Sequence, residues 1–185
     1  MSEHVCPWWL GYLLANPVRR LLQNPGAILG PHVQKGMKTL DIGAGMGFFS
    51  LPMAELAGGT GRVVCVDMQE RMIAGLLRRA ARAGLAERIE ARVCSTHSLK
   101  IDDLAGTLDF ALAFAMVHEV VDQERLLAEV KVALRPGGRL LLCEPVGHVT
   151  RDDFAATVAL ARRAGFDVAG QPRAPFSRCV LLQTA

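Results

Sequence analysis

Residues 41–47 place an acidic side chain two positions ahead of a glycine-rich run, Asp41-Ile42-Gly43-Ala44-Gly45-Met46-Gly47. Glycines at this spacing let the backbone of a turn approach a ligand closely. A second acid, Asp67, lies twenty residues beyond Gly47, directly after the apolar run 62–66. A carboxylate at the end of a strand can accept two hydrogen bonds from the hydroxyls of a ribose. The two motifs together predict a site for a ligand that carries a nucleoside.

The spacing of the glycines separates two classes of ligand. Dinucleotide sites usually show G-x-G-x-x-G, with a helix N-terminus set to hold a pyrophosphate. Here the pattern is G-x-G-x-G, and Asp41 stands before the first glycine. A carboxylate at that position repels a diphosphate and attracts a cation. The pattern therefore favours a cationic ligand, and the alternative is a glycine-rich turn between a strand and a helix that binds nothing.

Length and composition narrow the class of protein. The 185 residues are enough for one domain, and 51% of them are hydrophobic, which allows a sizeable core. The net charge is +3, and the densest basic cluster, residues 78–82, is interpreted as the solvated face of a helix. We therefore expect no nucleic-acid partner.

No apolar run reaches the roughly 18 residues of a membrane span, and residues 1–4 lack the basic start of a signal peptide. We expect a cytoplasmic monomer or homodimer.

The five cysteines show no C-x-x-C spacing, so we expect no metal site. Four of them lie in apolar runs, where a free thiol behaves as a small hydrophobe: Cys65, Cys94, Cys143 and Cys179. The odd count and a reducing compartment argue against disulfides. Cys6 is the exception, because it lies in an irregular segment rich in aromatic residues and is expected to be exposed.

Short strands and helices alternate from residue 37 onward. Strands are predicted at 39–42, 62–66, 89–93, 108–114, 139–143, from 165 to 168, and at 178–183. Helices are predicted at 48–56, 69–83, 123–134 and 151–164, with a short one at 102–104. The buried stripe of the second helix is predicted to hold Met72, Ile73, Leu76, Leu77 and Ala80. Gly84 should end that helix, and Thr150 should cap the start of the last one.

The connection between the last two predicted strands fixes the direction of the final strand. Only about ten residues join them, whereas a parallel crossover needs a dozen or more. We therefore predict an α/β fold: a single-domain, doubly wound, seven-stranded sheet, mostly parallel with the last strand antiparallel. Short N-terminal helices are expected at 10–14 and 17–23, between prolines. Residues 1–36 would form a helical lid segment, and residues 37–185 the nucleoside-binding domain.

From residue 37 to residue 183 the chain resembles the class I, Rossmann-like S-adenosylmethionine-dependent methyltransferases. Besides the two acidic motifs, residues 134–142 (Leu-Arg-Pro-Gly-Gly-Arg-Leu-Leu-Leu) look like the family's turn into its fifth strand, and residues 109–122 look like its fourth strand and the following loop. Among subgroups it looks most like the small-molecule type that includes quinone C-methyltransferases and arsenite methyltransferases. The resemblance implies S-adenosylmethionine as cofactor and a small-molecule methyl acceptor.

Carried over position by position, the resemblance also implies roles for individual residues. Asp41 orients the amino group of the methionine through water, and Asp67 holds the ribose hydroxyls. Met68 packs on one face of the adenine. The backbone positions that line the cofactor are Gly43, Ala44, Gly45 and Gly47 beside the sugar and carboxypropyl chain, and Phe114 and Ala115 at the ammonium group.

The segment after the third predicted strand departs from the family pattern. Many relatives carry an acid there that contacts the adenine amino group, whereas this chain has Cys94-Ser95-Thr96-His97. Ser95 or Thr96 can accept that hydrogen bond, more weakly than a carboxylate. The alternative is that both side chains cap the end of the strand.

His118 is the candidate catalytic residue. It follows the fourth strand, at the edge of an open α/β sheet where ligands bind, and an imidazole there can take a proton from the acceptor. The alternative is a histidine that only orders its loop through Glu119 or the backbone, and His148 is a weaker second candidate.

Because only residues 144–150 separate the fifth strand from the last helix, substrate walls must come largely from elsewhere. Trp8, Trp9 and Tyr12 are predicted, with His118, to contact the acceptor as a lid, or else to staple the N-terminal helix to the core.

Competing functions remain open. A noncatalytic S-adenosylmethionine-binding or regulatory subunit would use the same fold, and the short chain favours it. A metalloid or thiol methyltransferase would need Cys6 and further thiols to converge near His118. A nicotinamide-dependent dehydrogenase is disfavoured by the glycine spacing. The residues name neither the acceptor nor the methylated atom, which could be O, N, C or S.

Overall fold

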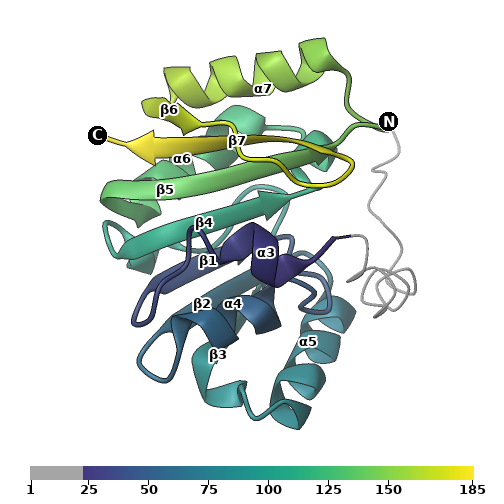
Figure 1. The fold of residues 1–185 in the computed structure, drawn as a ribbon, viewed down its shortest axis with the longest axis vertical. Coiled ribbons are helices and arrows are strands. Elements are labelled where there is room, and N and C mark those ends of the chain that lie inside the picture. Colours follow the sequence, from purple (N-terminus) through teal and green to yellow (C-terminus); the bar gives the residue numbers. More distant parts are fainter. Residues whose placement is uncertain (1–22) are drawn as a thin grey trace. The chain divides into compact units, whose positions relative to one another are not determined.

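A computed structural model describes residues 23–185 (Figure 1). These residues form two compact units, the first ending at residue 94 and the second beginning at residue 95. The helix predicted at 10–14, most of that predicted at 17–23, and the side chains of Cys6, Trp8, Trp9 and Tyr12 lie outside the described residues. None of the helices in residues 23–185 is both long and apolar enough to cross a membrane.

The first unit holds three parallel strands in the order β3-β2-β1. Its elements are α3 (Pro25–Leu29), β1 (Lys38–Ile42), α4 (Ser50–Ala57), β2 (Arg62–Asp67), α5 (Glu70–Arg82), η1 (Ala86–Arg88) and β3 (Ile89–Val93). Helix α4 packs against β1 and β2, and α5 packs against β2 and β3. The side chains of residues 63–66 are completely buried, as expected for a parallel strand that is covered on both faces.

Helix α3 was not predicted from the sequence, although its start carries a readable signal. The side chain of Asn24 accepts a hydrogen bond from the N–H of Ala27 at 3.3 Å, and Pro25 stands at the first helical position. Asparagine as the capping residue followed by proline is a favoured helix start. The helix packs against α4 and buries Ile28 and Leu29, so this described part of the N-terminal segment belongs to the core of the first unit.

The prediction for α5 is confirmed at its end and is wrong at one core position. Gly84 has φ 68° and follows the helix, and the N–H of Leu85 donates to the carbonyl of Ala80 at 2.9 Å. This is the glycine-ended helix terminus that the sequence indicates. Leu77, however, is 43% exposed and lies outside the buried stripe. Gly75 lies on the buried side instead, which the sequence analysis did not predict.

The second unit holds four strands in the order β4-β5-β7-β6. Its elements are η2 (Asp102–Leu104), β4 (Leu108–Phe114), η3 (Val117–Glu119), α6 (Gln123–Ala133), β5 (Leu134–Pro145), α7 (Arg151–Arg163), β6 (Phe166–Gly170) and β7 (Ser177–Thr184). Thr150 caps α7 as predicted: its hydroxyl accepts from the N–H of Asp153, and the Asp153 carboxylate accepts from the backbone of Thr150. This reciprocal pair satisfies two groups that a helix start leaves unpaired.

Strand β7 runs antiparallel to both of its neighbours, β5 and β6, as the short connection before it predicts. The strands β1 to β5 pair in parallel within each unit. All seven strands belong to one mixed sheet, which confirms the predicted α/β fold class.

Strand β5 begins five residues earlier than predicted, because the expected turn is a bulge inside the strand. Leu134 pairs with Leu108 and Arg139 with Phe110, so residues 135–138 bulge out of the register. A side chain at Gly138 would place its Cβ only 2.8 Å from the carbonyl oxygen of Arg135. The glycine therefore permits a close approach that any other residue would block.

Cys143 and Cys179 form a disulfide, so the prediction that these cysteines are free thiols is wrong. The two residues are direct partners in the register of β5 and β7, with their Cα atoms 4.1 Å apart. Residues that face each other in an antiparallel pair project their side chains to the same face of the sheet. The link was hidden in the sequence because 36 positions separate the two cysteines. Cys65 is a buried free thiol, as predicted, and Cys94 is a partly exposed one.

Breaking this disulfide should lower the free energy of unfolding by roughly 2–4 kcal/mol, because the unfolded chain regains the entropy of an open loop. Cys179→Ser should therefore unfold at a lower urea concentration than the wild type, while Cys94→Ser, which removes a free thiol, should stay close to it. Dithiothreitol should shift the wild-type midpoint to that of Cys179→Ser. A wild-type midpoint that does not respond to reduction would contradict the prediction.

Candidate functional site

The glycine-rich loop, residues 43–47, follows β1 in the first unit. Its three glycines have φ values of 53° to 82°, in the left-handed region that favours glycine. The N–H groups of Gly43 and Ala44 both donate to the carbonyl of Val66, at 2.9 and 3.1 Å. A Cβ atom at Gly45 would have no neighbour within 4 Å, so the space beside this residue is open. The loop is therefore hydrogen-bonded to β2 through Gly43 and Ala44, and the space beside Gly45 is unoccupied by other protein atoms.

Asp67 ties the glycine-rich loop to the end of β2. Its Oδ2 accepts from the N–H of Gly45 and its Oδ1 from the N–H of Gln69, both at 2.9 Å. Burial raises the pKa of this carboxyl, and the hydrogen bonds from Gln69 and Gly45 oppose that rise. A carboxylate has about four acceptor positions, so two of them remain for hydroxyl groups of a ligand. The contact of Asp67 with a ligand stays a prediction, and its tie to Gly45 was not predicted from the sequence.

Helix α5 supports the loop from a second direction. The guanidinium of Arg79 donates to the carbonyl of Met46. A Cβ at Gly75 would come within 3.0 Å of the Met46 side chain, so the missing side chain lets the loop approach the helix. The interpretation of residues 78–82 as a purely solvated face is therefore wrong for Arg79. No signal within the helix itself distinguishes this arginine from its neighbours.

Asp41, on β1, is buried, with 3% of its surface exposed. Its Oδ2 accepts from the hydroxyl of Ser50, at the start of α4, at 2.5 Å. Burial raises the pKa of Asp41 to about 7, the Ser50 hydrogen bond lowers it, and the charge of Asp67 raises it further. The carboxyl is therefore poised between its neutral and charged forms near neutral pH. It becomes fully ionised only above that range, or when a cation binds beside it.

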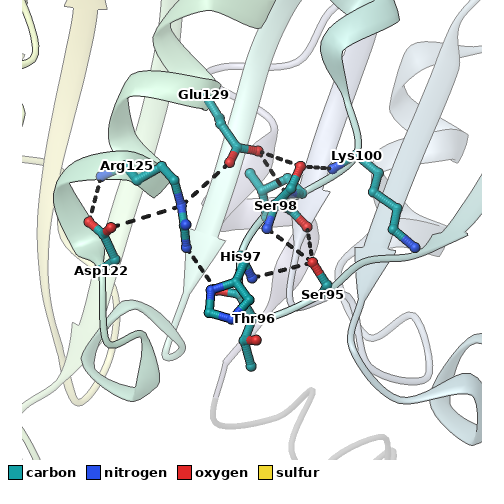
Figure 2. A network of polar contacts seen from close by, with 9 residues as sticks. Ser95, Thr96, His97, Ser98, Lys100, Asp122, Arg125 and Glu129 are labelled. Atoms are coloured by element: carbon teal, nitrogen blue, oxygen red, sulfur yellow. Dashed lines mark hydrogen bonds and ion pairs between the residues drawn. The ribbon is translucent and has the colours of Figure 1, made fainter.

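The segment that follows β3 is tied to helix α6 by a network of polar contacts within the second unit (Figure 2). Glu129 accepts from the N–H of Leu99 at 2.7 Å, and Arg125 donates to the carbonyl of Thr96 at 2.9 Å. Figure 2 shows Arg125 between Asp122 and Glu129, to which its Nε lies 3.9 and 3.8 Å away. A cavity of about 220 Å³ opens beside Arg125 and Glu129. The two charged residues of α6 thus hold the position of the whole segment.

Within that segment, the two predicted adenine contacts have different surroundings. The hydroxyl of Ser95 accepts from the N–H groups of His97 and Ser98, at 3.3 and 3.1 Å, so it closes the turn after β3. This is the strand-end cap that the sequence analysis gave as the alternative. Thr96 and Ser95 are both exposed, and the carbonyl of Thr96 bonds to Arg125. The adenine contact itself stays a prediction.

The backbone changes direction at the end of β4. Phe114 is buried, and the next residue, Ala115, has φ 56°, which is unusual for a residue with a side chain. The N–H of Ala115 donates to the carbonyl of Cys143 at 2.7 Å. Such strain persists only where neighbouring groups fix the backbone, and it is concentrated at functional sites. The two positions predicted to face the methionine ammonium therefore lie at a constrained turn.

His118 and Glu144 form a close pair at the carboxyl ends of β4 and β5. The Nδ1 atom of His118 lies 2.5 Å from Oε2 of Glu144. The other carboxylate oxygen, Oε1, accepts from the N–H groups of Val117 and His118, at 2.8 and 3.2 Å. The Glu144 side chain is 2% exposed and that of His118 is 26% exposed. The carboxylate is thus enclosed, while part of the imidazole reaches the surface.

The electrostatics of this pair follow from burial. Burial raises the pKa of Glu144, and its hydrogen bonds to His118 and Val117 oppose that rise. The second candidate, His148, has its ring centroid 6.1 Å from that of His118. The sequence analysis named His118 and missed its partner. The available signal was an ionisable residue, Glu144, directly after the apolar run 140–143 of β5.

The fold and the glycine-rich loop agree with the class of protein that the comparisons identify, the methyltransferases. A family model described as "Methyltransferase domain" matches residues 33–169. The chain belongs to this family. A structure of an S-adenosylmethionine-dependent methyltransferase from Aquifex aeolicus superposes with a TM-score of 0.87 at 20% identity, covering 98% of this chain and 100% of that one. At this identity the likeness concerns the fold.

Two other comparisons concern a longer relative and a protein named for a different reaction. The ubiquinone/menaquinone biosynthesis C-methyltransferase UbiE of Cellvibrio japonicus is 34% identical over 113 residues, which are 60% of this chain and 44% of that protein. The chain thus spans less than half the length of the curated relatives it matches. The [4+2]-cyclase SpnF superposes with a TM-score of 0.69 at 20% identity, over 80% of this chain and 59% of that one. The fold by itself therefore does not fix the reaction.

The free energy of unfolding should decrease as the pH rises from about 4 to about 7, with a contribution from Asp41. Its carboxyl has a pKa of about 7 in the folded protein, against an ordinary value of 3.8. The folded state therefore binds the proton more tightly, and this stabilisation is lost as the pH rises through that window. Urea unfolding at pH 4.5, 6 and 7.5 should show a smaller decrease for Asp41→Asn, which cannot titrate. Equal pH dependence in both proteins would refute the assignment.

Asp67→Ala should destabilise the first unit as well as weaken cofactor binding. The substitution removes the acceptor of two backbone N–H groups, and an unsatisfied buried donor costs about 1–3 kcal/mol. Urea unfolding should show this loss, and titration with S-adenosylhomocysteine should show binding weaker by about 1.5–3 kcal/mol. Asp167→Asn, at an exposed position of β6, is the matched control and should change neither quantity. Unchanged stability in Asp67→Ala would mean that the tie to Gly45 contributes nothing.

Proposed function

We propose that this protein transfers a methyl group from S-adenosylmethionine to a small-molecule acceptor. The observation that carries the proposal is the glycine-rich loop whose N–H group at Gly45 is held by the carboxylate of Asp67. That arrangement leaves open space beside the loop and free acceptor positions on Asp67 for ribose hydroxyls. A poised, buried Asp41 suits a cationic ligand better than a diphosphate. These features fit a sulfonium nucleoside.

The proposed cofactor contacts are those expected from the sequence. They comprise Asp41, Gly43, Ala44, Gly45, Gly47, Asp67, Met68, Ser95, Thr96, Phe114 and Ala115. The exposure of Met68, at 39%, leaves its side chain available to pack on an adenine face. When bound, the cofactor supplies an electrophilic methyl group. The chain's residues would hold that group in line with the acceptor, which can contribute several kcal/mol to the rate.

On the acceptor side we propose His118 as the proton acceptor, and Trp8, Trp9 and Tyr12 of the segment 1–36 as a lid over the domain formed by residues 37–185. The partly exposed ring of His118 supports the first role. The aromatic composition of the segment supports the second. Relatives named as quinone C-methyltransferases support a small-molecule acceptor, with methylation at O, N, C or S left open by their partial coverage.

The cellular setting is part of the proposal. We propose a cytoplasmic monomer or homodimer that binds no nucleic acid, because the basic residues are dispersed along the chain. In a reducing cytoplasm the Cys143–Cys179 pair would be present as two thiols. The pair is buried at the interface of β5 and β7, so both states fit the same strand register.

One other function has a specific observation in its favour. A protein named as a [4+2]-cyclase, SpnF, shares the fold, so the fold is compatible with a protein that does not transfer a methyl group. The alternative is therefore a noncatalytic S-adenosylmethionine-binding or regulatory subunit. A metalloid or thiol methyltransferase has less support, since Cys65, Cys143 and Cys179 are all buried within strands.

The proposed cofactor is tested by isothermal titration calorimetry. S-adenosylmethionine and S-adenosylhomocysteine should bind, and NAD should not, because the glycine spacing differs from that of dinucleotide sites and a carboxylate at Asp41 repels a diphosphate. Heat from NAD with none from either sulfur nucleoside would overturn the proposal.

Incubation with a panel of phenols, amines and thiols then separates the transferase from the noncatalytic protein. Release of S-adenosylhomocysteine that depends on acceptor supports the transferase, whereas binding without release supports the noncatalytic protein.

A further inference from the structure

The contact between Glu144 and His118 fixes which ring nitrogen carries a proton. A carboxylate only accepts hydrogen bonds, and Oε2 of Glu144 lies 2.5 Å from Nδ1 of His118. In the neutral imidazole, Nδ1 must then hold the hydrogen, and Nε2 keeps its lone pair. Which nitrogen is protonated in a histidine is generally set by the partner of the other nitrogen.

Glu144 also holds the backbone on which His118 stands. Its Oε1 receives the N–H groups of Val117 and His118, the first groups of the short helix η3. The opposite side of this turn is held by Gln123, whose side-chain amide donates to the carbonyl of Val117 at 3.1 Å and accepts from Thr157 at 2.9 Å. Two independent anchors therefore hold the turn, and only the one through Glu144 touches the imidazole.

We propose that Glu144 is a positioning residue that holds His118 with Nε2 unprotonated and directed away from the carboxylate, as the proton acceptor of the methyl-transfer step. The inference rests on the proposed function. It adds a residue that the sequence analysis did not name, and it assigns each nitrogen of His118 a task. The enclosed carboxylate faces Nδ1, and the exposed part of the ring is available to an acceptor.

For an acceptor X–H, methyl transfer moves one methyl group and one proton. The lone pair of X forms a bond to the methyl carbon as the carbon–sulfur bond breaks, and that electron pair stays on sulfur, which becomes neutral. The proton of X passes to Nε2 of His118. The resulting imidazolium donates from Nδ1 to Glu144, whose negative charge stabilises it. The proton then leaves to water when the products dissociate.

Glu144→Gln separates this role from a merely structural one. The substituted amide keeps an oxygen that can accept from Val117 and His118, so the turn retains its anchor. Its NH₂ group, however, can only donate toward Nδ1, which forces the hydrogen of a neutral ring onto Nε2. Gln123→Ala is the matched control, because it removes the other anchor of the turn and leaves the Glu144–His118 contact in place.

The first measurement is the tautomer of His118, read from ¹⁵N chemical shifts of the ring above the pH at which the imidazole is charged. The wild type and Gln123→Ala should show a protonated Nδ1, and Glu144→Gln should show a protonated Nε2. His118→Asn identifies the resonances. A wild-type ring protonated at Nε2, or an unchanged tautomer in Glu144→Gln, would overturn the proposal.

The second measurement uses diethyl pyrocarbonate, which reacts with an unprotonated ring nitrogen. The rate at His118, followed by mass spectrometry, should fall about tenfold in Glu144→Gln relative to exposed His97 in the same sample, since one hydrogen bond shifts the tautomer ratio by about that factor. Equal relative rates in both proteins would contradict the assignment. Neither measurement needs the cofactor. Absence of S-adenosylhomocysteine binding would therefore overturn the proposed function. The tautomer of His118 is measured independently of that result.

Discussion

The carboxylate of Asp67 fixes the conformation of the glycine-rich loop in the first unit. A loop of three glycines has little conformational preference of its own, because each glycine samples left-handed and right-handed backbone about equally. The loop keeps one conformation since its N–H groups end on Val66 and Asp67, at the tip of β2, and its carbonyl at Met46 meets Arg79 of α5. The surface proposed to bind the cofactor is therefore built by neighbouring elements that restrain a run of glycines.

Both units contain buried carboxylates that fix the positions of neighbouring segments. Asp41, Asp67 and Glu144 each have a raised pKa whose largest cause is burial. Each is also hydrogen-bonded: Asp41 to a hydroxyl, and the other two to backbone N–H groups at the starts of loops or turns. A buried acid without such partners would cost several kcal/mol. Here the donors offset that cost, and the acids fix loop positions that hydrophobic packing could not specify.

Local signals in the sequence predicted local features well. Alternating apolar runs predicted the strands, Gly84 and Thr150 marked helix ends, and the short connection after β6 gave the direction of β7. The failures are long-range. The Cys143–Cys179 disulfide depends on strand register, and so does the meeting of Glu144 with His118, 26 positions away. Side-chain partners across such separations cannot be read from periodicity, which is why His118 was named without Glu144 and Arg79 was taken for a solvated residue.

The place of β7 has a consequence for how the second unit folds. β7 follows β6 in the chain yet lies between β5 and β6, so β6 reaches the sheet only through β7. A hairpin of two neighbouring segments forms quickly, whereas pairing β7 with β5 closes a much longer loop and is slower. We expect the β6–β7 hairpin to form first and to dock as a unit. Until it does, β5 presents an open edge with unpaired backbone groups, which is the surface where a partly folded chain is most prone to pair with another copy.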